Sequence, residues 1–328
     1  MSDTAPDFAS IQNAAQTIRG QAAYTPLLES TALNETLGCR LFLKAEMLQK
    51  TGSFKFRGAF NAISRLTKEQ LAKGVFAYSS GNHAQGVALA AKIMGTKATI
   101  LMPEDTPAIK VANTKGYGAK VLTFNRKTES REDIGNAICA REGLAFIKPF
   151  DNINVVSGQG TVGLEIIDQL AELGMQADII AAPCGGGGLV SGIAIAAAKN
   201  SPATKIFTAE PENFDDAARS LVAGTRLSNS GDHSSSCDAI LTPMTGEITF
   251  PLLKQYGVNG LVVTEAEVFE AMRIAFSYFK VVIEPGGAVA LAALLTGKTA
   301  TAGKIIVAVG SGGNVDPALY CKVLSSDF

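Results

Sequence analysis

The sequence predicts an α/β protein in which mostly parallel sheets are covered by helices on both faces. Short apolar strands alternate along the chain with segments of helical periodicity, a pattern typical of parallel sheets. The strands fall into two sets, and glycine-rich loops follow several of them. Two sets predict two lobes, with the smaller inserted in the larger. We expect residues 1–70 and 150–328 to form the large, cofactor-binding domain and residues 71–149 the small, mobile one.

The expected elements follow from local signals. Asp7 can cap a first helix that ends at Gly20. Residues 40–44 form a strand that leads into a loop, and Phe56 begins a helix. Further strands are expected at 75–78, 98–102, 120–124, 179–182, 205–209, 260–263 and 304–309, with helices at about 83–94 and 105–115. The serine-rich stretch 228–236 is expected to be a surface loop.

Composition excludes several classes of protein. The 328 residues are 47% hydrophobic and 18% charged, as in a globular protein with a large core. A net charge of −1 without a basic stripe argues against nucleic acid and anionic membrane as partners. No apolar run is long enough to span a membrane, and the N-terminus lacks an apolar signal core. The five cysteines are scattered, which favours a reducing, cytoplasmic location.

Lys55 is the first candidate for chemistry, because it lies between Phe54 and Phe56. Desolvation between aromatic rings lowers the pKa of an ammonium group and leaves a nucleophilic amine. Such an amine can form a Schiff base with an aldehyde. The alternative is a solvated lysine whose stem lies on an apolar surface.

Gly185, Gly186, Gly187 and Gly188 follow a strand and precede a helix. Four glycines at such a junction let the backbone curl around an anion at the helix N-terminus. This suits one phosphate monoester, although glycines could also serve a tight connection.

The sequence contains one G-x-G-x-x-G pattern, at Gly158, Gly160 and Gly163. A dinucleotide-binding motif follows a strong strand and is accompanied by an acidic residue at the end of the next strand. Here the preceding strand, 154–156, is short, and Asp178 precedes the next strand. We therefore do not expect a dinucleotide site.

Four motifs occur in an order that identifies a family. They are 53–59 (SFKFRGA), 79–83 (SSGNH), 185–188 (GGGG) and 311–314 (SGGN), within the segment 25–316. The chain resembles fold type II pyridoxal-phosphate enzymes (the tryptophan synthase beta-like family), in the branch of serine/threonine dehydratases, serine racemases and 3-hydroxyaspartate dehydratases. The resemblance implies that pyridoxal 5′-phosphate is bound by Phe54, Lys55, Asn82, Gly185, Gly186, Gly187, Gly188, Glu284 and Ser311. The resemblance also implies that Lys55 carries the cofactor, that the four glycines bind the cofactor's phosphate, and that Ser311 binds its pyridine nitrogen.

The loop Ser79, Ser80, Gly81, Asn82 and His83 opens a helix, so its N–H groups suit a carboxylate. By resemblance it binds the α-carboxylate of the substrate, although alone it could be an ordinary helix cap. Plain dehydratases often carry alanine where this chain has Ser80, whereas racemases and 3-hydroxyaspartate dehydratases carry serine. The resemblance thus makes Ser80 a second acid–base group, opposite Lys55.

Two further sites are expected. Glu210, the Phe214 carbonyl and Asp216 offer oxygen ligands for Mg²⁺, Mn²⁺ or Ca²⁺, and the racemases have such a site; the alternative is a solvated acidic turn. Arg131 matches an arginine that meets a second carboxylate in related enzymes, but it could be a surface charge. Cys237-Asp238-Ala239 replaces the common Ala-Asp-Gly, which leaves the shape of the pocket open.

The expected function is that of a pyridoxal-phosphate-dependent carbon–nitrogen lyase. It would remove water and ammonia from a β-hydroxy amino acid (3-hydroxyaspartate, L-serine or L-threonine) and give a 2-oxo acid. An amino acid racemase is the nearest alternative, and a nucleotide-binding regulatory or redox protein is the alternative from another class. We expect a small amino acid as substrate and a homodimer.

Overall fold

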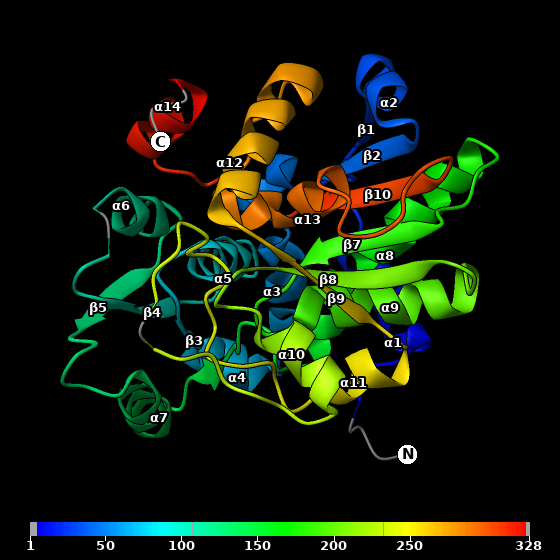
Figure 1. Ribbon diagram of the computed structural model, residues 1–328. Helices are drawn as coiled ribbons and strands as arrows, with labels where there is room; N and C mark the ends of the chain where they lie inside the picture. Colours follow the sequence, from blue (N-terminus) through cyan, green and yellow to red (C-terminus); the bar gives the residue numbers. More distant parts are fainter. Residues whose placement is uncertain (1–4, 107, 232, 326–328) are drawn as a thin grey trace.

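The computed structural model describes residues 5–106, 108–231 and 233–325. Their strands form a six-stranded and a four-stranded sheet (Figure 1). The larger sheet has the order β1-β2-β10-β7-β8-β9, in which β1 is antiparallel to β2 and all other neighbours are parallel. Its strands are β1 (Leu27–Glu29), β2 (Arg40–Ala45), β7 (Ile179–Pro183), β8 (Lys205–Pro211), β9 (Asn259–Val263) and β10 (Ile305–Gly310).

The smaller sheet is fully parallel, with the order β5-β4-β3-β6. Its strands are β3 (Val75–Tyr78), β4 (Ala98–Pro103), β5 (Lys120–Phe124) and β6 (Ala145–Phe146). All four come from one stretch of chain between β2 and β7, which confirms the expected insertion of a smaller lobe. We call residues 75–146 the small lobe and the rest the large lobe.

Helices cover both faces of the larger sheet, as predicted. On one face α13 packs across β7, β8, β9 and β10, and on the other α8 and α9 pack together (Figure 1). The helices are α1 (Phe8–Ile18), α2 (Thr31–Leu37), α3 (Lys55–Ile63), α4 (Lys68–Lys73), α5 (Asn82–Ile93), α6 (Ala108–Gly116), α7 (Arg131–Glu142), α8 (Ile153–Glu172), α9 (Gly188–Asn200), α10 (Asp216–Ala223), α11 (Thr249–Gln255), α12 (Glu265–Ile274), α13 (Pro285–Leu295) and α14 (Pro317–Ser325). Short helical turns lie at Glu46–Leu48, Lys50–Gly52 and Ala275–Phe279.

The G-x-G-x-x-G pattern lies inside α8, so the expected short strand at 154–156 is wrong. Asn152 caps this 20-residue helix by accepting hydrogen bonds from the N–H groups of Asn154 and Val155. A Cβ at Gly158 would lie 2.6 Å from Gly58 Cα of α3, and one at Gly160 only 2.6 Å from Ile11 Cδ1 of α1. The glycines therefore permit close helix packing, and they form no nucleotide-binding loop.

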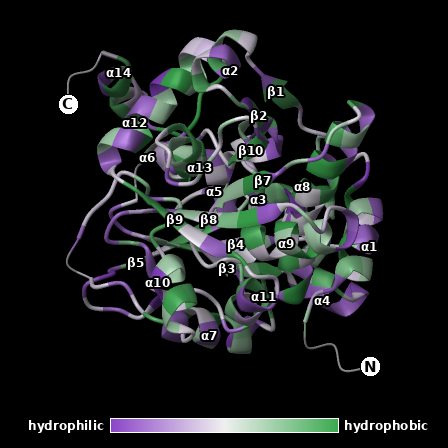
Figure 2. Cartoon of the chain, turned by 45° about the vertical axis from the view of Figure 1, so that its right-hand side comes forward, coloured by the Kyte–Doolittle hydropathy of each residue, from purple (hydrophilic) through white to green (hydrophobic). Residues whose placement is uncertain are grey.

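The apolar residues lie between the layers. The buried clusters follow the central strands and helices such as α9, which Figure 2 shows mostly in the hydrophobic colour. Asp7 caps α1 as predicted, with Ile11, Ala14 and Ile18 buried. Among the described residues no helix is both long and apolar enough to cross a membrane.

Candidate active site

The lysine loop and the C-terminal glycine loop, far apart in sequence, lie side by side. Ser53 and Gly312 form an isolated antiparallel bridge. The Phe54 N–H donates to the Ser311 carbonyl at 3.1 Å, and the Gly313 N–H donates to the Gly52 carbonyl at 2.9 Å. Because β2 and β10 are parallel neighbours, both loops leave the sheet at the same edge. The start of α3 is thereby fixed against the Ser311 loop.

Asn82 joins two further segments to these loops. Its amide nitrogen donates to Glu284 Oε1 at 2.5 Å, and its amide oxygen accepts from Asn314 Nδ2 at 2.7 Å. Asn314 also donates to the Thr51 carbonyl at 2.8 Å. Burial raises the pKa of Glu284 to about 7, although the hydrogen bond from Asn82 opposes this. The first helical residue of α5 is thus bound to both loops and to the start of α13.

Lys55 is the first residue of α3 and directly follows Phe54, which pairs with the Ser311 loop. Desolvation lowers the pKa of its ammonium to about 8, and the Glu284 carboxylate partly opposes that shift. Its Nζ donates to the Pro149 carbonyl at 3.1 Å. A Cβ at Gly86 would lie 3.1 Å from the Lys55 carbonyl carbon, so α5 packs directly on this segment. The neutral amine of Lys55 therefore makes up about a tenth of the population at pH 7 and about half at pH 8.

The expected arrangement of Lys55 between two aromatic rings is wrong for Phe56. Lys55 Nζ lies 5.1 Å from the centre of the Phe54 ring. Phe56 is buried, and its ring meets Phe60 and the ammonium of Lys50. Successive side chains at a helix start point in different directions, so neighbours on both sides of a lysine do not enclose it.

The tetraglycine segment forms a turn into α9 that leaves no room for side chains. Gly187 is the N-cap of α9 and has a positive φ of 88°. A Cβ at Gly186 would lie 2.2 Å from the Phe150 ring, and one at Gly188 only 3.2 Å from Phe150 Cα. Lys55 donates to the carbonyl of Pro149, and Phe150 is the next residue. The tetraglycine segment, which packs on Phe150, therefore adjoins Lys55. Its backbone N–H groups lie at the N-terminus of α9, where an anion is favoured.

The loop from Ser79 to His83 follows β3 and ends at the start of α5. The Ser79 hydroxyl accepts from the Gly81 N–H at 3.2 Å, and Ser80 is half-buried. His83 is buried, and its Nε2 pairs with the Ile147 carbonyl at 2.8 Å. Desolvation and the charge of Lys55 lower the pKa of His83 to about 3. His83 is therefore neutral at physiological pH and suits a positioning role.

Arg131 does not join these contacts. It is the first residue of α7, and its side chain is 44% exposed. Its Nε donates to Glu132 at 2.8 Å, and its guanidinium lies 4.8 Å from the centre of the Tyr78 ring. Tyr78 directly precedes Ser79, so this ring connects Arg131 to the loop.

Glu210 and Asp216 are both buried beside the start of α10. The Glu210 carboxylate accepts from the N–H groups of Ala217 and Ala218 at 2.9 and 2.8 Å. Asn229 donates to Asp216 Oδ1 at 2.7 Å, whereas Asp216 Oδ2 is buried and has no hydrogen-bond partner among the described residues. Burial raises the pKa of Asp216 to about 6, and burial with the nearby Asp216 charge raises that of Glu210 well above its usual range. The described residues contain no cluster of three or more His, Cys, Asp or Glu side chains suited to a metal.

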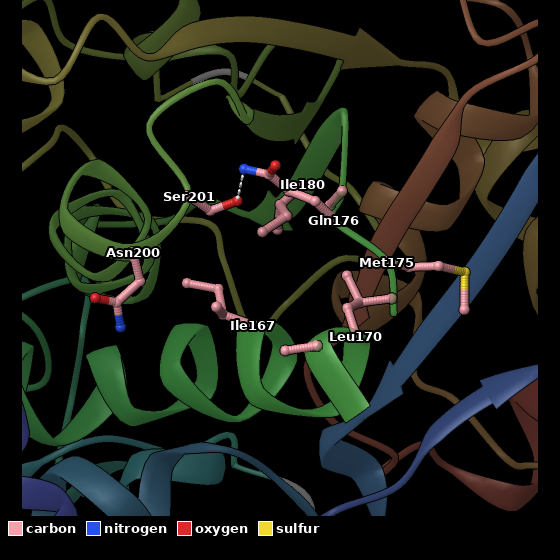
Figure 3. A pocket seen from close by; sticks show the side chains of 9 residues that line it. Ile167, Leu170, Met175, Gln176, Ile180, Asn200 and Ser201 are labelled. Carbon is pink, nitrogen blue, oxygen red and sulfur yellow. Dashed lines mark hydrogen bonds between the residues drawn. The ribbon is translucent and has the colours of Figure 1, made fainter. Parts of the chain in front are cut away.

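A cavity of about 210 Å³ lies elsewhere in the large lobe (Figure 3). Its lining includes Met175–Ala177 and Asn200–Ser201, near the N-terminal end of β7, whereas the tetraglycine segment follows the other end of β7. Its walls are apolar apart from groups such as Gln176, which donates to the Ser201 hydroxyl at 2.7 Å (Figure 3). It carries no titratable group and is not the candidate site.

Sequence reasoning missed three residues of this site. Asn314 was part of a noted motif, but its role as the bridge between Thr51 and Asn82 became visible only in the fold. Pro149 and Phe150, which contact Lys55 and the tetraglycine segment, carry no local signal of such a role.

Comparisons with known proteins agree with this geometry. A family model described as pyridoxal-phosphate dependent enzyme matches residues 18–312. The chain is 41% identical to the L-threo-3-hydroxyaspartate ammonia-lyase of Saccharomyces cerevisiae, covering 98% of this chain and 97% of that protein. The structure of maize serine racemase superposes with a TM-score of 0.91 at 37% identity, covering 98% of each chain. That of the serine racemase from Dictyostelium discoideum gives 0.88 at 39% identity, covering 95% of this chain and 99% of that one. The chain therefore belongs to the family of pyridoxal-phosphate dependent enzymes.

Proposed function

We propose that this chain is a carbon–nitrogen lyase that removes water and ammonia from a β-hydroxy amino acid and yields a 2-oxo acid. The observation that carries the proposal is Lys55, a lysine of pKa about 8 that directly follows a set of joined segments. Hydrogen bonds join four loops there: the lysine loop (50–54), the loop of residues 79–83, the segment at Glu284 and the loop of residues 311–314. The named relatives support it, since they include ammonia-lyases that act on 3-hydroxyaspartate and threonine. 3-Hydroxyaspartate is the first substrate to test, ahead of L-serine and L-threonine.

The residues present fit pyridoxal 5′-phosphate. The hydroxyls of Thr51 and Ser53 and the Nδ1 of His83 are buried without partners in the described chain, as expected where a polar ligand completes the site. Lys55 would carry the cofactor, with Phe54 beside it, the tetraglycine N–H groups on its phosphate, and Asn82, Glu284 and Ser311 around its ring. Pyridoxal phosphate supplies an electron sink that acidifies the Cα–H bond of a bound amino acid.

The chain's own groups would then direct the reaction. The N–H groups of the loop from Ser79 to His83 bind and orient the α-carboxylate. Once the amino group of the substrate has replaced Lys55 on the cofactor, the neutral amine of Lys55 would take the α-proton on its Nζ, and its pKa of about 8 suits a base that works near neutrality. The β-hydroxyl would leave with one proton as water, and a second water would then hydrolyse the released product to the 2-oxo acid and ammonia. A panel of 3-hydroxyaspartate, L-serine and L-threonine, assayed for ammonia and 2-oxo acid, tests this reaction. Holoenzyme that forms neither product from any of them would refute it.

Racemisation is the second candidate activity, because a hydroxyl stands at position 80 in the α-carboxylate loop. Ser80 would give or take the α-proton on the face opposite Lys55. Replacing Ser80 with alanine should lower the ratio of racemisation to elimination about a hundredfold or more, the usual contribution of a positioned acid–base group. Chiral chromatography of serine recovered from D₂O, beside an ammonia assay, measures the ratio. Ser80→Thr retains a hydroxyl and should keep more of it. An unchanged ratio in Ser80→Ala would assign Ser80 a structural role only.

A divalent cation, Mg²⁺, Mn²⁺ or Ca²⁺, would fit between Glu210, Asp216 and the Phe214 carbonyl. Two buried carboxyls with one unpartnered oxygen, Asp216 Oδ2, support this proposal. At a concentration a hundredfold above its dissociation constant, Mg²⁺ should stabilise the fold by about 2.7 kcal/mol. Thermal unfolding with and without chelator measures this effect. It should vanish in Asp216→Asn and persist in Glu212→Gln, because Glu212 is exposed. An equal response of both variants would exclude this site.

We also propose a homodimer in which the domain of residues 71–149 moves over the site. Leu48, Phe276, Tyr278 and Val282 are 41–53% exposed. The segments that carry Leu48 and Val282 adjoin, because a Cβ at Gly313 would lie 2.7 Å from the Val282 carbonyl and 3.0 Å from the Cβ of Met47, the residue before Leu48. Exposed apolar side chains of this kind are typical of subunit contacts. Sedimentation of wild type and Val282→Asp tests the dimer, which the charge should weaken.

A further inference from the structure

One ion pair joins the two lobes in the described part of the chain. It connects Lys110 of α6, in the small lobe, with Asp238, in the large-lobe loop that precedes α11. The Lys110 side chain is only 17% exposed, whereas that of Asp238 is 54% exposed. The other ion pairs of the described residues lie within one lobe. The Lys110 ammonium, at the contact between the lobes, is therefore paired with a carboxylate of the chain itself, that of Asp238.

This ion pair borders the candidate active site. The Asp238 loop lies against the start of α13, because a Cβ at Gly286 would be 3.2 Å from Ala239 Cβ. It also lies against the tetraglycine segment, because a Cβ at Gly185 would be 3.2 Å from the Ile240 carbonyl oxygen. The charges of Asp238 and Lys110 shift the pKa of Glu284 in opposite directions, which places both near this carboxyl.

Both segments carry buried hydroxyls without partners. Thr106 precedes Lys110 by four residues, and Thr242 follows Asp238 by four. The Oγ1 atoms of both threonines are buried and make no hydrogen bond within the described chain. Thr242 also touches the tetraglycine segment, since its Cγ2 would lie 3.4 Å from a Cβ at Gly185. Unsatisfied buried hydroxyls in the two segments that carry this ion pair are groups that a small polar ligand could complete.

We propose that Lys110 determines specificity by binding the second carboxylate of a dicarboxylic substrate, which displaces Asp238. This inference rests on the proposed lyase function and deepens it. Exchanging one carboxylate for another at Lys110 keeps the charge of the site balanced, whereas L-serine offers only a hydroxymethyl group. Arg131 is less well placed for this role, because its side chain is 44% exposed, whereas that of Lys110 is 17% exposed.

The proposal predicts that substitutions of Lys110 and of Asp238 change substrate preference in opposite directions. Lys110→Met should lower the ratio of kcat/KM for 3-hydroxyaspartate to that for L-serine about ten- to hundredfold, the value of one charge-assisted contact. Asp238→Asn should raise the same ratio, because it removes the competing carboxylate. Lys110→Arg should keep most of the preference, and Lys115→Met, an exposed lysine on the same helix, should leave it unchanged.

A second measurement does not depend on turnover. Calorimetry of the holoenzyme with malonate, a dicarboxylate without an amino group, should give a higher Kd for Lys110→Met and a lower Kd for Asp238→Asn. If no β-hydroxy amino acid is a substrate, the proposed function fails, while malonate still tests Lys110.

Three results would overturn the proposal. The pair is merely a contact between lobes if Lys110→Met and Asp238→Asn lower kcat/KM equally for 3-hydroxyaspartate and L-serine and leave the Kd for malonate unchanged. Arg131 is the selector if Arg131→Met collapses the ratio and Lys110→Met does not. A lower ratio in Asp238→Asn would show that Asp238 supports, rather than competes with, dicarboxylate binding.

Discussion

Lys55→Ala should lower turnover of every β-hydroxy amino acid by at least about a thousandfold, the scale of loss when a covalent catalyst loses its nucleophile. No other described lysine shares its position at the meeting point of the four loops. The matched control is Lys50→Ala, since Lys50 lies on the Phe56 ring and is exposed. Ammonia release under saturating substrate measures the effect, and the control should stay close to wild type.

The pKa of Lys55 provides a second test of the same assignment. Loading of the cofactor requires the neutral amine, which makes up about a tenth of the population at pH 7 when the pKa is about 8. The rate at which cofactor-free protein regains visible absorption should therefore rise about tenfold between pH 7 and 9, and then level off. Lys55→Ala should show no borohydride-fixed cofactor at any pH. A Lys55→Ala protein with cofactor fixed to another residue and normal turnover would refute the assignment.

The sequence predicted the sheets because parallel strands buried on both faces have a simple apolar signature. Carboxyl ends of parallel strands meet at one edge, so the motifs after β7 and β10 could be expected to converge, whereas the motif after β3 belongs to the other sheet and meets them only through the packing of the two lobes. The helix α8 was harder to predict. Its three glycines disfavour a helix by propensity, and only their contacts with α1, α3 and α9 explain them.

Partners that are set by tertiary packing could not be read from the sequence. Lys110 and Asp238 are 128 residues apart, and neither lies in a motif that indicates the other. The direction of Arg131 depends on the Tyr78 ring, which no spacing rule provides. The position of Phe56 was mistaken for a related reason, because adjacent residues of a helix face different neighbours.

A buried charge network behind the lysine loop was also invisible in the sequence. Arg57, two residues after Lys55, has no exposed surface, and neither has Glu46. The Arg57 guanidinium donates to Glu46 at 2.8 Å and to Glu165 at 2.5 and 2.8 Å. Lys44 donates to the same Glu165 at 2.7 Å. Two cations and two anions thus balance in a buried site, and they connect β2, α3 and α8.

Arg57→Met should consequently lower the free energy of unfolding by about 3–5 kcal/mol, because it leaves Glu46 and part of Glu165 buried without their partner. The matched control is Arg40→Met, which removes an arginine–glutamate pair whose Arg40 side chain is 46% exposed. That pair should contribute less than about 1 kcal/mol. Denaturant unfolding of both variants and wild type measures the difference. A loss of less than about 1 kcal/mol in Arg57→Met would mean that methionine packing offsets the broken network, and that the lysine loop is fixed by its pairing with the Ser311 loop alone.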